Sequence, residues 1–267
     1  MAKVHIFGES VQGASHSRVD KICQDSNKID SFGQGIYVIA VADGHGSDKC
    51  PYSDEGSFSA TKVFCKLLID YYKKYKDKEA LQLFLQTEGE IKIAQTIDLE
   101  WKKLIKTIHN KKNRDEYDDE FDIYKLYGTT LLGLAITDTF VFAFQVGDGD
   151  ITYIDANGVS PVITDEKILG VETHSLSKKE SWKKALTKLI VKNQDYNLPY
   201  MFMLTTDGFA NSFISEEEFH KNCNGYYDMV KEHSFAAVKD NLGTWLKETS
   251  EQGCGDDITA VLAYFEE

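Results

Sequence analysis

The chain has 267 residues, of which 42% are hydrophobic and only 3 are proline. This size and composition allow one buried core, so we expect a single folded domain over residues 1–267 rather than a disordered polypeptide. The formal net charge of −13 repels nucleic-acid phosphates and anionic lipid, which excludes nucleic acid and membranes as main partners.

The predicted location follows from what the sequence lacks. No apolar segment is long enough to cross a membrane, and the first ten residues lack the pattern of a signal peptide. The 5 cysteines are scattered without close pairs, which is typical of reduced thiols rather than of disulfides or a zinc site. We therefore expect a soluble, cytoplasmic protein.

The first half of the chain is predicted to hold two strands and two long helices. Residues 4–7 are β-like, and the apolar run 36–42 predicts a buried strand. Apolar residues recur at helical spacing from Ser53 to about Tyr75 and from about Glu79 to His109. The acidic segment from Asn110 to Asp122 is predicted to be a solvated loop rather than a metal site, because nothing apolar there would fix its geometry.

The second half is predicted to be rich in strands, at residues 129–137, 139–146, 151–154, 159–163, 200–205 and 258–265. Asn157-Gly158 is typical of a tight hairpin turn. Helices are expected from Ser177 to Lys192, from Ser215, where Glu218 stands at the capping-box position, and from about Ser234 to Thr249. These groups predict packed sheets with helices outside.

Aspartates stand at the ends of four very apolar strands. Asp43, Asp148 and Asp207 each follow such a strand, and Asp256 with Asp257 precedes the last one. A single Asp-Gly pair is ordinary turn chemistry. Four buried, unpaired carboxylates, however, would each be costly and need a shared compensation. A divalent cation supplies it, and oxygen ligands without a His or Cys cluster indicate Mg²⁺ or Mn²⁺ rather than Zn²⁺.

The aspartates belong to an ordered series of short motifs, each weak alone but specific together. The series is Gln24-Asp25, Asp43-Gly44-His45-Gly46, Gly128-Thr129-Thr130, Val146-Gly147-Asp148, Thr206-Asp207-Gly208 and Gly255-Asp256-Asp257-Ile258-Thr259. In order and spacing it resembles the metal-dependent protein serine/threonine phosphatases of type 2C, from about His16 to Phe265. Segments 13–25 and 172–176 resemble a compact bacterial branch. The expected fold is an α+β, four-layer αββα sandwich with two mainly antiparallel sheets flanked by helices.

The resemblance implies a set of metal ligands for two Mg²⁺ or Mn²⁺ ions. Asp43 would bridge both ions, and the Gly44 carbonyl would bind one of them. Asp207 and Asp256 would bind the other, and Asp148 would help to bind a weaker third ion.

The resemblance also implies catalytic and phosphate-binding residues. Asp25 would hold metal-bound waters, and His45 would be the general acid for the leaving oxygen, with a packed turn histidine as the alternative. Family members often carry a phosphate-binding Arg five residues before the first aspartate, but Asp20 stands there. Arg18 or His16 would then contact the substrate phosphate, unless Arg18 is simply an exposed side chain.

Two further departures from the family pattern concern the metals. Asn211 stands four residues after Asp207, where the family often has Asp, which weakens the prediction of a third ion. Asp257 replaces the more usual Asn beside Asp256, and its extra charge is expected to tighten metal binding.

The interval of about 164–199 corresponds to a mobile flap that helps to select substrates in the family it resembles. Six lysines make it basic: Lys178, Lys179, Lys183, Lys184, Lys188 and Lys192. They would form either a solvated helix face or a surface that guides a phosphoprotein toward the metals.

The predicted function is hydrolysis of phosphoserine and phosphothreonine in proteins by a metal-activated water, without a covalent phosphoenzyme. The resemblance alone adds a cognate serine/threonine kinase as a partner. One alternative is a non-catalytic pseudo-phosphatase that binds a phosphoprotein or kinase, although the intact Asp43, Asp207 and Asp256 argue against it. Another is a metal phosphohydrolase that acts on small molecules.

Overall fold

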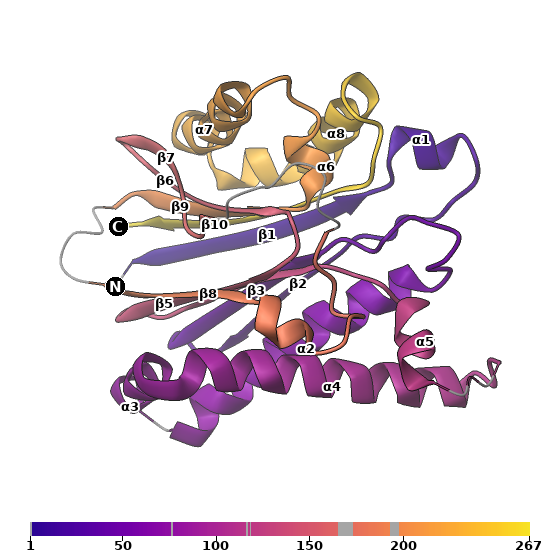
Figure 1. Ribbon diagram of the computed structural model, residues 1–267. Helices are drawn as coiled ribbons and strands as arrows, with labels where there is room; N and C mark the ends of the chain where they lie inside the picture. The colour runs from indigo at the N-terminus through magenta and orange to yellow at the C-terminus, as the bar shows by residue number, and fades with distance from the viewer. Residues whose placement is uncertain (1, 76, 116, 118, 165–172, 193–197) are drawn as a thin grey trace.

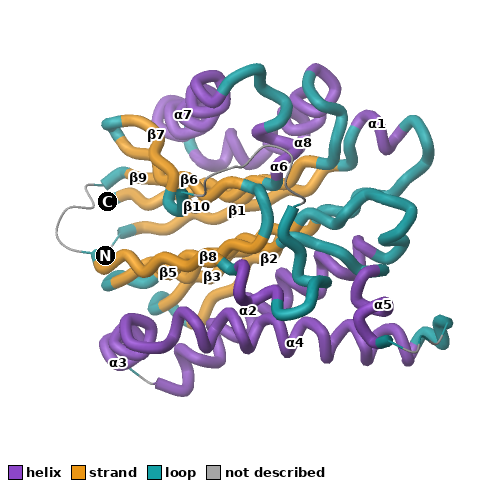
Figure 2. The backbone as a smooth tube through the Cα atoms, in the orientation of Figure 1, coloured by secondary structure: helices purple, strands orange, loops and turns teal. Residues whose placement is uncertain are grey.

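Two five-stranded sheets lie face to face at the centre of the computed structural model, which describes residues 2–75, 77–115, 117, 119–164, 173–192 and 198–267. Helices cover the outer face of each sheet, so the chain forms the expected αββα sandwich (Figure 1). Figure 2 shows the two strand layers between the helical ones. Hydrophobic residues fill the three interfaces between layers: Phe64 and Trp101 under one helical layer, Leu132 and Val261 between the sheets, and Leu242 under the other helical layer.

The first sheet has the order β1-β10-β9-β6-β7 and is antiparallel throughout. Its strands are β1 (Lys3–Val11), β10 (Ile258–Glu266), β9 (Tyr200–Thr205), β6 (Asp150–Asp155) and β7 (Gly158–Pro161). Thr205 pairs with Asp150 on one side and with Ala260 on the other. The end of β9 and the starts of β6 and β10 therefore share one edge of the sheet.

The second sheet has the order β2-β3-β4-β5-β8 and is also antiparallel. Its strands are β2 (Ser26–Phe32), β3 (Ile36–Ala42), β4 (Leu131–Ile136), β5 (Phe140–Val146) and β8 (Leu186–Val191). Ser26 pairs with Ala42, and Leu131 pairs with Val146. The start of β2 and the ends of β3 and β5 therefore also lie at one edge.

The helices follow the amphipathic segments of the sequence. One layer holds α2 (Ser53–Tyr75), α3 (Lys78–Phe84) and α4 (Glu90–Lys111), and the other holds α7 (Glu216–His233) and α8 (Phe235–Gln252). Shorter helices are α1 (Ala14–Ser17), α5 (Glu120–Lys125) and α6 (Asp207–Ala210). The Ser215 hydroxyl accepts a hydrogen bond from the Glu218 N–H at 3.2 Å, which confirms the predicted start of α7. No helix in the described part of the chain is both long and apolar enough to span a membrane.

Three predicted boundaries differ from the structure. The expected helix 79–109 is interrupted by a π-helical turn at Leu85–Gly89. The acidic loop ends earlier than expected, because Asp119 caps α5 by accepting a hydrogen bond from the Phe121 N–H at 2.9 Å. The helix predicted from Ser177 to Lys192 is wrong. Its only helical part is a 3-10 turn at Ser181–Lys184, and Leu186–Val191 forms β8, because pairing with β5 overrides the local helical preference.

The flap-like interval 164–199 is only partly within the described residues, since 165–172 and 193–197 lie outside them. Of the rest, β8 is an integral strand of the second sheet. Residues 175 and 176 dock on Thr129, whose carbonyl accepts hydrogen bonds from the Leu176 N–H at 3.0 Å and from the Ser175 hydroxyl at 3.1 Å.

Candidate metal centre

Five aspartates meet where the strand ends of the two sheets come together. The pKa of Asp43 is raised well above its usual value, first because its carboxyl is removed from water. It is raised further by the negative charges of its neighbours Asp25, Asp207, Asp256 and Asp148. Five carboxylates so close together cannot all stay ionised without a compensating cation. The structure therefore brings together the predicted carboxylate ligands.

Asp25 is held by the threonines of the first sheet. Removal from water raises the pKa of Asp25 to about 8, opposed by a hydrogen bond from Thr206 and reinforced by the charge of Asp257. The Thr206 hydroxyl donates to Asp25 Oδ2 at 2.7 Å and accepts from the Thr259 N–H at 2.9 Å. Residues on the strands β9 and β10 thus orient a carboxyl group that lies just before β2.

The Gly-Thr-Thr motif fixes the backbone of Asp43. The Asp43 carbonyl accepts hydrogen bonds from the Thr129 hydroxyl at 2.8 Å and from the Thr130 N–H at 2.9 Å. The Asp43 N–H in turn donates to the Thr130 hydroxyl at 2.9 Å. A β-carbon on Gly44 would lie 2.5 Å from the Gln24 carbonyl oxygen and 2.7 Å from that of Ser53, so this tight turn requires glycine.

The next two acidic positions each have a polar side chain beside them. The Asn211 side-chain amide donates to Asp207 Oδ2 at 3.0 Å, so the residue that departs from the family pattern orients a predicted ligand. The Thr173 hydroxyl donates to Asp148 Oδ2 at 2.7 Å. Gly147 has a φ of +111°, a conformation that favours glycine and that turns the chain between β5 and Asp148.

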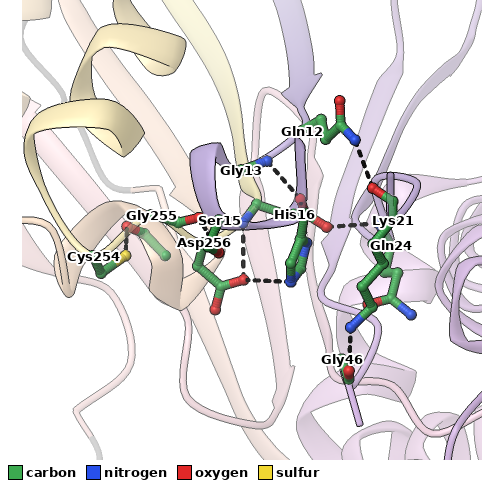
Figure 3. Close-up of polar contacts among 12 residues, drawn as sticks. Gln12, Gly13, Ser15, His16, Lys21, Gln24, Gly46, Cys254, Gly255 and Asp256 are labelled. Atoms are coloured by element: carbon green, nitrogen blue, oxygen red, sulfur yellow. Dashed lines mark hydrogen bonds and ion pairs between the residues drawn. The ribbon is translucent and has the colours of Figure 1, made fainter. Parts of the chain in front are cut away.

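Asp257 is turned toward the N-terminal segment rather than into the aspartate cluster. Its buried carboxylate accepts hydrogen bonds from the Gly13 and Gln24 N–H groups, both at 2.7 Å, and from His16 Nδ1 at 2.8 Å. Asp257 thus positions the N-terminal segment, and since its charge also acts on Asp25, the expectation that it tightens metal binding stays a prediction. His16 Nε2 lies 3.7 Å from Asp256 Oδ1, and Figure 3 shows the imidazole between Asp256 and the Lys21–Gln24 pair.

Lys21 is a site residue that sequence reasoning missed. Its ammonium group donates to the Gly46 carbonyl, as Figure 3 shows. A β-carbon on Gly46 would lie 3.0 Å from Lys21 Nζ, 3.3 Å from Gln24 Oε1 and 3.7 Å from His16 Nε2. Three polar groups thus converge beside the Asp-Gly-His-Gly turn. The available signal was a basic residue directly after Asp20, the position where the family often has Arg.

Arg18, which the sequence suggested as a phosphate contact, is not part of this convergence. It is exposed and lines a separate hollow with Glu9, Lys247 and Glu251. His16 approaches Asp256 of the cluster, and Lys21 contacts the turn that follows Asp43. These two residues are therefore better placed than Arg18 to meet a substrate phosphate.

His45 packs on a glycine. Its backbone N–H donates to the Gly128 carbonyl at 3.0 Å, and a β-carbon on Gly128 would lie 2.6 Å from His45 Cδ2. The imidazole is half-buried and stands two residues after Asp43. His45 is thus packed as a turn histidine would be, and it also lies beside the aspartate cluster, as a general acid would have to.

The protein ligands alone do not complete a metal cage. Among the described residues, no three His, Cys, Asp or Glu side chains are arranged to hold an ion by themselves. The donor set is oxygen-rich, its charges need compensation, and the Gly44 carbonyl lies in the same turn as Asp43, so the residues fit Mg²⁺ or Mn²⁺.

Comparison with a protein-family model gives a match over most of the chain. A family model described as protein phosphatase 2C matches residues 12–247, a range that ends before Asp256. No curated protein matches the chain.

Solved structures share the fold over essentially the whole chain. The serine/threonine phosphatase of S. agalactiae has a TM-score of 0.61 and 16% identity, and the match covers 99% of this chain and 100% of that one. The catalytic domain of the serine/threonine phosphatase PstP in complex with 2 manganese ions has a TM-score of 0.60 and 13% identity, with 100% of both chains covered. RsbX in complex with magnesium has a TM-score of 0.52 and 17% identity, also with 100% of both chains covered. At these identities the likeness shows the fold.

Proposed function

Because the chain belongs to the protein phosphatase 2C family, we propose that it is a metal-dependent hydrolase that removes phosphate from phosphoserine and phosphothreonine in proteins. The whole of residues 1–267 would form the catalytic domain. The observation that carries the proposal is the gathering of Asp25, Asp148, Asp207 and Asp256 around Asp43 at the strand ends, where their charges raise its pKa. Such a cluster is stable with all its charges only when cations share it.

The proposed cofactors are two Mg²⁺ or Mn²⁺ ions, the metals carried by RsbX and PstP in their solved structures. The proposed ligands are Asp43, the Gly44 carbonyl, Asp207 and Asp256, with Asp148 for a weaker third ion. When bound, these ions supply an activated water and offset charge on the phosphoryl oxygens. The chain's own contribution is to hold the carboxylates at one edge through the hydrogen bonds of Thr129, Thr130 and Thr206.

We assign the substrate phosphate to Lys21 and His16. Both side chains converge beside Gly46, and the Lys21 ammonium can give a phosphoryl oxygen the charge-assisted hydrogen bond that it now gives the Gly46 carbonyl. The hydrogen bond between His16 Nδ1 and Asp257 orients the imidazole so that Nε2 faces Asp256, and Nε2 would donate to a phosphoryl oxygen in the doubly protonated imidazolium form. Lys21 would thereby replace the Arg that the family often carries at the position of Asp20.

The remaining roles concern protons. Asp25, oriented by Thr206, would accept a hydrogen bond from the attacking water. His45, supported by Gly128, would donate a proton to the departing serine or threonine oxygen. A pseudo-phosphatase would not require the complete set Asp43, Asp207 and Asp256, whereas hydrolysis does. Phosphoproteins are accordingly the proposed partners, together with the kinase that phosphorylates them.

The test is phosphate release from p-nitrophenyl phosphate and from a phosphothreonine peptide, with Mn²⁺, with Mg²⁺ and with EDTA. We expect release with either metal and none in EDTA. A phosphosugar and a nucleotide, run in parallel, should be much poorer substrates than the peptide. Absence of release with metal demonstrably bound would contradict the proposal in favour of a phosphoprotein-binding role. Preference for the small molecules would contradict the assignment of protein substrates.

A further inference from the structure

A groove of about 850 Å³ opens beside His45. Three segments line it: the turn after Asp43, α5 with its N-cap Asp119, and residues 173–179. Figure 1 places α5 at the same end of the sandwich as α1, which is the end where the aspartates meet. The groove also touches the site directly, because it is lined by His45 and by Thr173, and the Thr173 hydroxyl donates to Asp148 at 2.7 Å.

The charge of the groove is opposite to that of the chain as a whole. Its charged lining residues are Lys49, Lys125, Lys178, Lys179 and Asp119, in a chain of net charge −13. Asp119 is already engaged in capping α5. Lys125 pairs with Asp122 at 2.7 Å, but both side chains are largely exposed, so the pair is weak and leaves the lysine able to change partners. The groove is therefore a positive strip beside an acidic site.

The lysines of the groove stand on a fixed support. Lys102, buried in α4, donates to the Lys178 carbonyl at 2.8 Å and to Asp98 Oδ1 at 2.7 Å. Lys102 also lies 5.6 Å from the centre of the Phe121 ring, and Lys179 lies 6.0 Å from it on the groove side. Phe121 thus gives the groove an apolar wall with two ammonium groups near its ring, and the segment 178–179 is held to α4.

The six lysines predicted from the sequence to form one basic surface fall into separate groups. Lys183 pairs with Glu180 at 2.8 Å, and Lys192 donates to the Thr137 carbonyl at 2.7 Å and to the Tyr200 hydroxyl at 3.1 Å. Lys178 and Lys179, by contrast, line the groove beside His45. Of the six lysines, Lys178 and Lys179 are therefore the ones that lie beside the site.

We propose that this groove binds acidic residues flanking the phosphorylated serine or threonine of a protein substrate. The inference rests on the proposed function, because it places the phosphoryl group at the aspartate cluster and the adjacent chain in the groove. The occupant follows from charge complementarity: the acidic surface elsewhere repels an acidic segment, and the lysines attract it to the entrance that leads to His45. The apolar wall at Phe121 would contact one apolar residue of the same segment.

The test is a binding measurement that needs no turnover. Fluorescence anisotropy in EDTA compares two labelled phosphothreonine peptides that differ only in having flanking Asp residues or Asn in their place. Wild-type protein should bind the acidic peptide about tenfold more tightly, with an advantage that shrinks as salt is raised. The double variant Lys49→Glu/Lys179→Glu should lose that preference. The matched control Lys62→Glu/Lys221→Glu, which makes the same charge change at exposed positions outside the groove, should keep it.

Two outcomes would overturn the groove assignment: equal binding of the two peptides by wild-type protein, or equal loss of preference in the groove and control variants. Circular dichroism of both variants establishes that they are folded. Because EDTA removes the metal-dependent reaction, failure of hydrolysis in the earlier assay would contradict the proposed function alone, and the anisotropy result would still decide the groove.

Discussion

Acidic residues are compensated in two different ways in two regions of this molecule. At the sheet edge, Asp43 is removed from water and surrounded by four carboxylates, which raises its pKa. In the acidic segment at the start of α5, Asp119 caps the helix, Glu120 pairs with Lys106 at 3.0 Å and Asp122 pairs with Lys125 at 2.7 Å. The difference teaches that acidic residues on an exposed surface find their own partners. Strand ends force them together, so that only a cation can compensate them.

The strongest way to break the comparison is to remove the central carboxylate. Asp43→Asn should reduce metal-dependent turnover by about 10³-fold or more, because the variant loses the ligand shared by both ions. The melting temperature in EDTA should stay the same or rise, because the variant no longer buries an ionisable carboxyl among four others. Asp122→Asn, the matched change in the exposed segment, should leave kcat/KM within about twofold. Equal effects of the two variants would contradict the distinction between the regions.

A smaller loss of activity is expected when the proposed phosphate-binding residue Lys21 is replaced. Lys21→Ala should lower kcat/KM for a phosphothreonine peptide by about 10- to 100-fold, the range expected for losing one hydrogen bond to a charged group. Lys21→Arg should restore most of it, because Arg keeps the charge and the donors. Arg18→Ala should change kcat/KM by less than about twofold, since Arg18 is exposed and lines another hollow. A larger loss in Arg18→Ala than in Lys21→Ala would reverse the assignment.

The pH dependence of stability separates the two regions without a substrate. The pKa of Asp25 is raised from 3.8 to about 8, so between these values the folded metal-free protein holds a proton that the unfolded chain releases. Its contribution to the free energy of unfolding is present at low pH and is lost as pH rises from about 4 to about 8. Urea unfolding in EDTA should therefore show a flatter pH dependence for Asp25→Asn than for Asp119→Asn. Identical slopes would mean that Asp25 is ionised in the folded protein.

The smallest expected effect belongs to the exposed segment. Asp119→Ala should destabilise the protein by about 0.5–2 kcal/mol, the usual cost of losing a helix N-cap, as measured by urea unfolding with Mn²⁺ present. Asp119→Ser, which can still cap α5, should recover most of that loss. A loss in Asp119→Ala of the size expected for a buried ion pair, about 3–5 kcal/mol, would show that this segment is more than a capped, solvated turn.

The fold and the carboxylate cluster were predictable from the sequence for one physical reason. Buried strands are continuous apolar runs with defined ends, so aspartates at those ends, such as Asp43 and Asp207, mark an edge of a sheet. The motif order then indicated the sandwich, which the structure confirms.

Long-range pairing explains what the sequence did not reveal. The strand β8 lies in a lysine-rich stretch, and its partner β5 is remote in sequence, so local pattern favoured a helix instead. Arg18 and Lys21 lie on either side of Asp20 in the sequence, and it is the contact of Lys21 with the turn at Gly46, seen in the structure, that separates them. Asp257, likewise, is separated from Gly13 and Gln24 by most of the chain, so its three hydrogen bonds could not be inferred.

The central claim is that the aspartate cluster is a site for divalent metal, and calorimetric titration of Mn²⁺ into the metal-free full chain tests it most directly. The account predicts at least two ions bound per chain, a higher melting temperature when they are bound, and binding weakened by about 100-fold or more in Asp43→Asn, with Asp122→Asn unchanged. Absence of Mn²⁺ and Mg²⁺ binding by the wild-type chain, or equal affinity in Asp43→Asn, would contradict it.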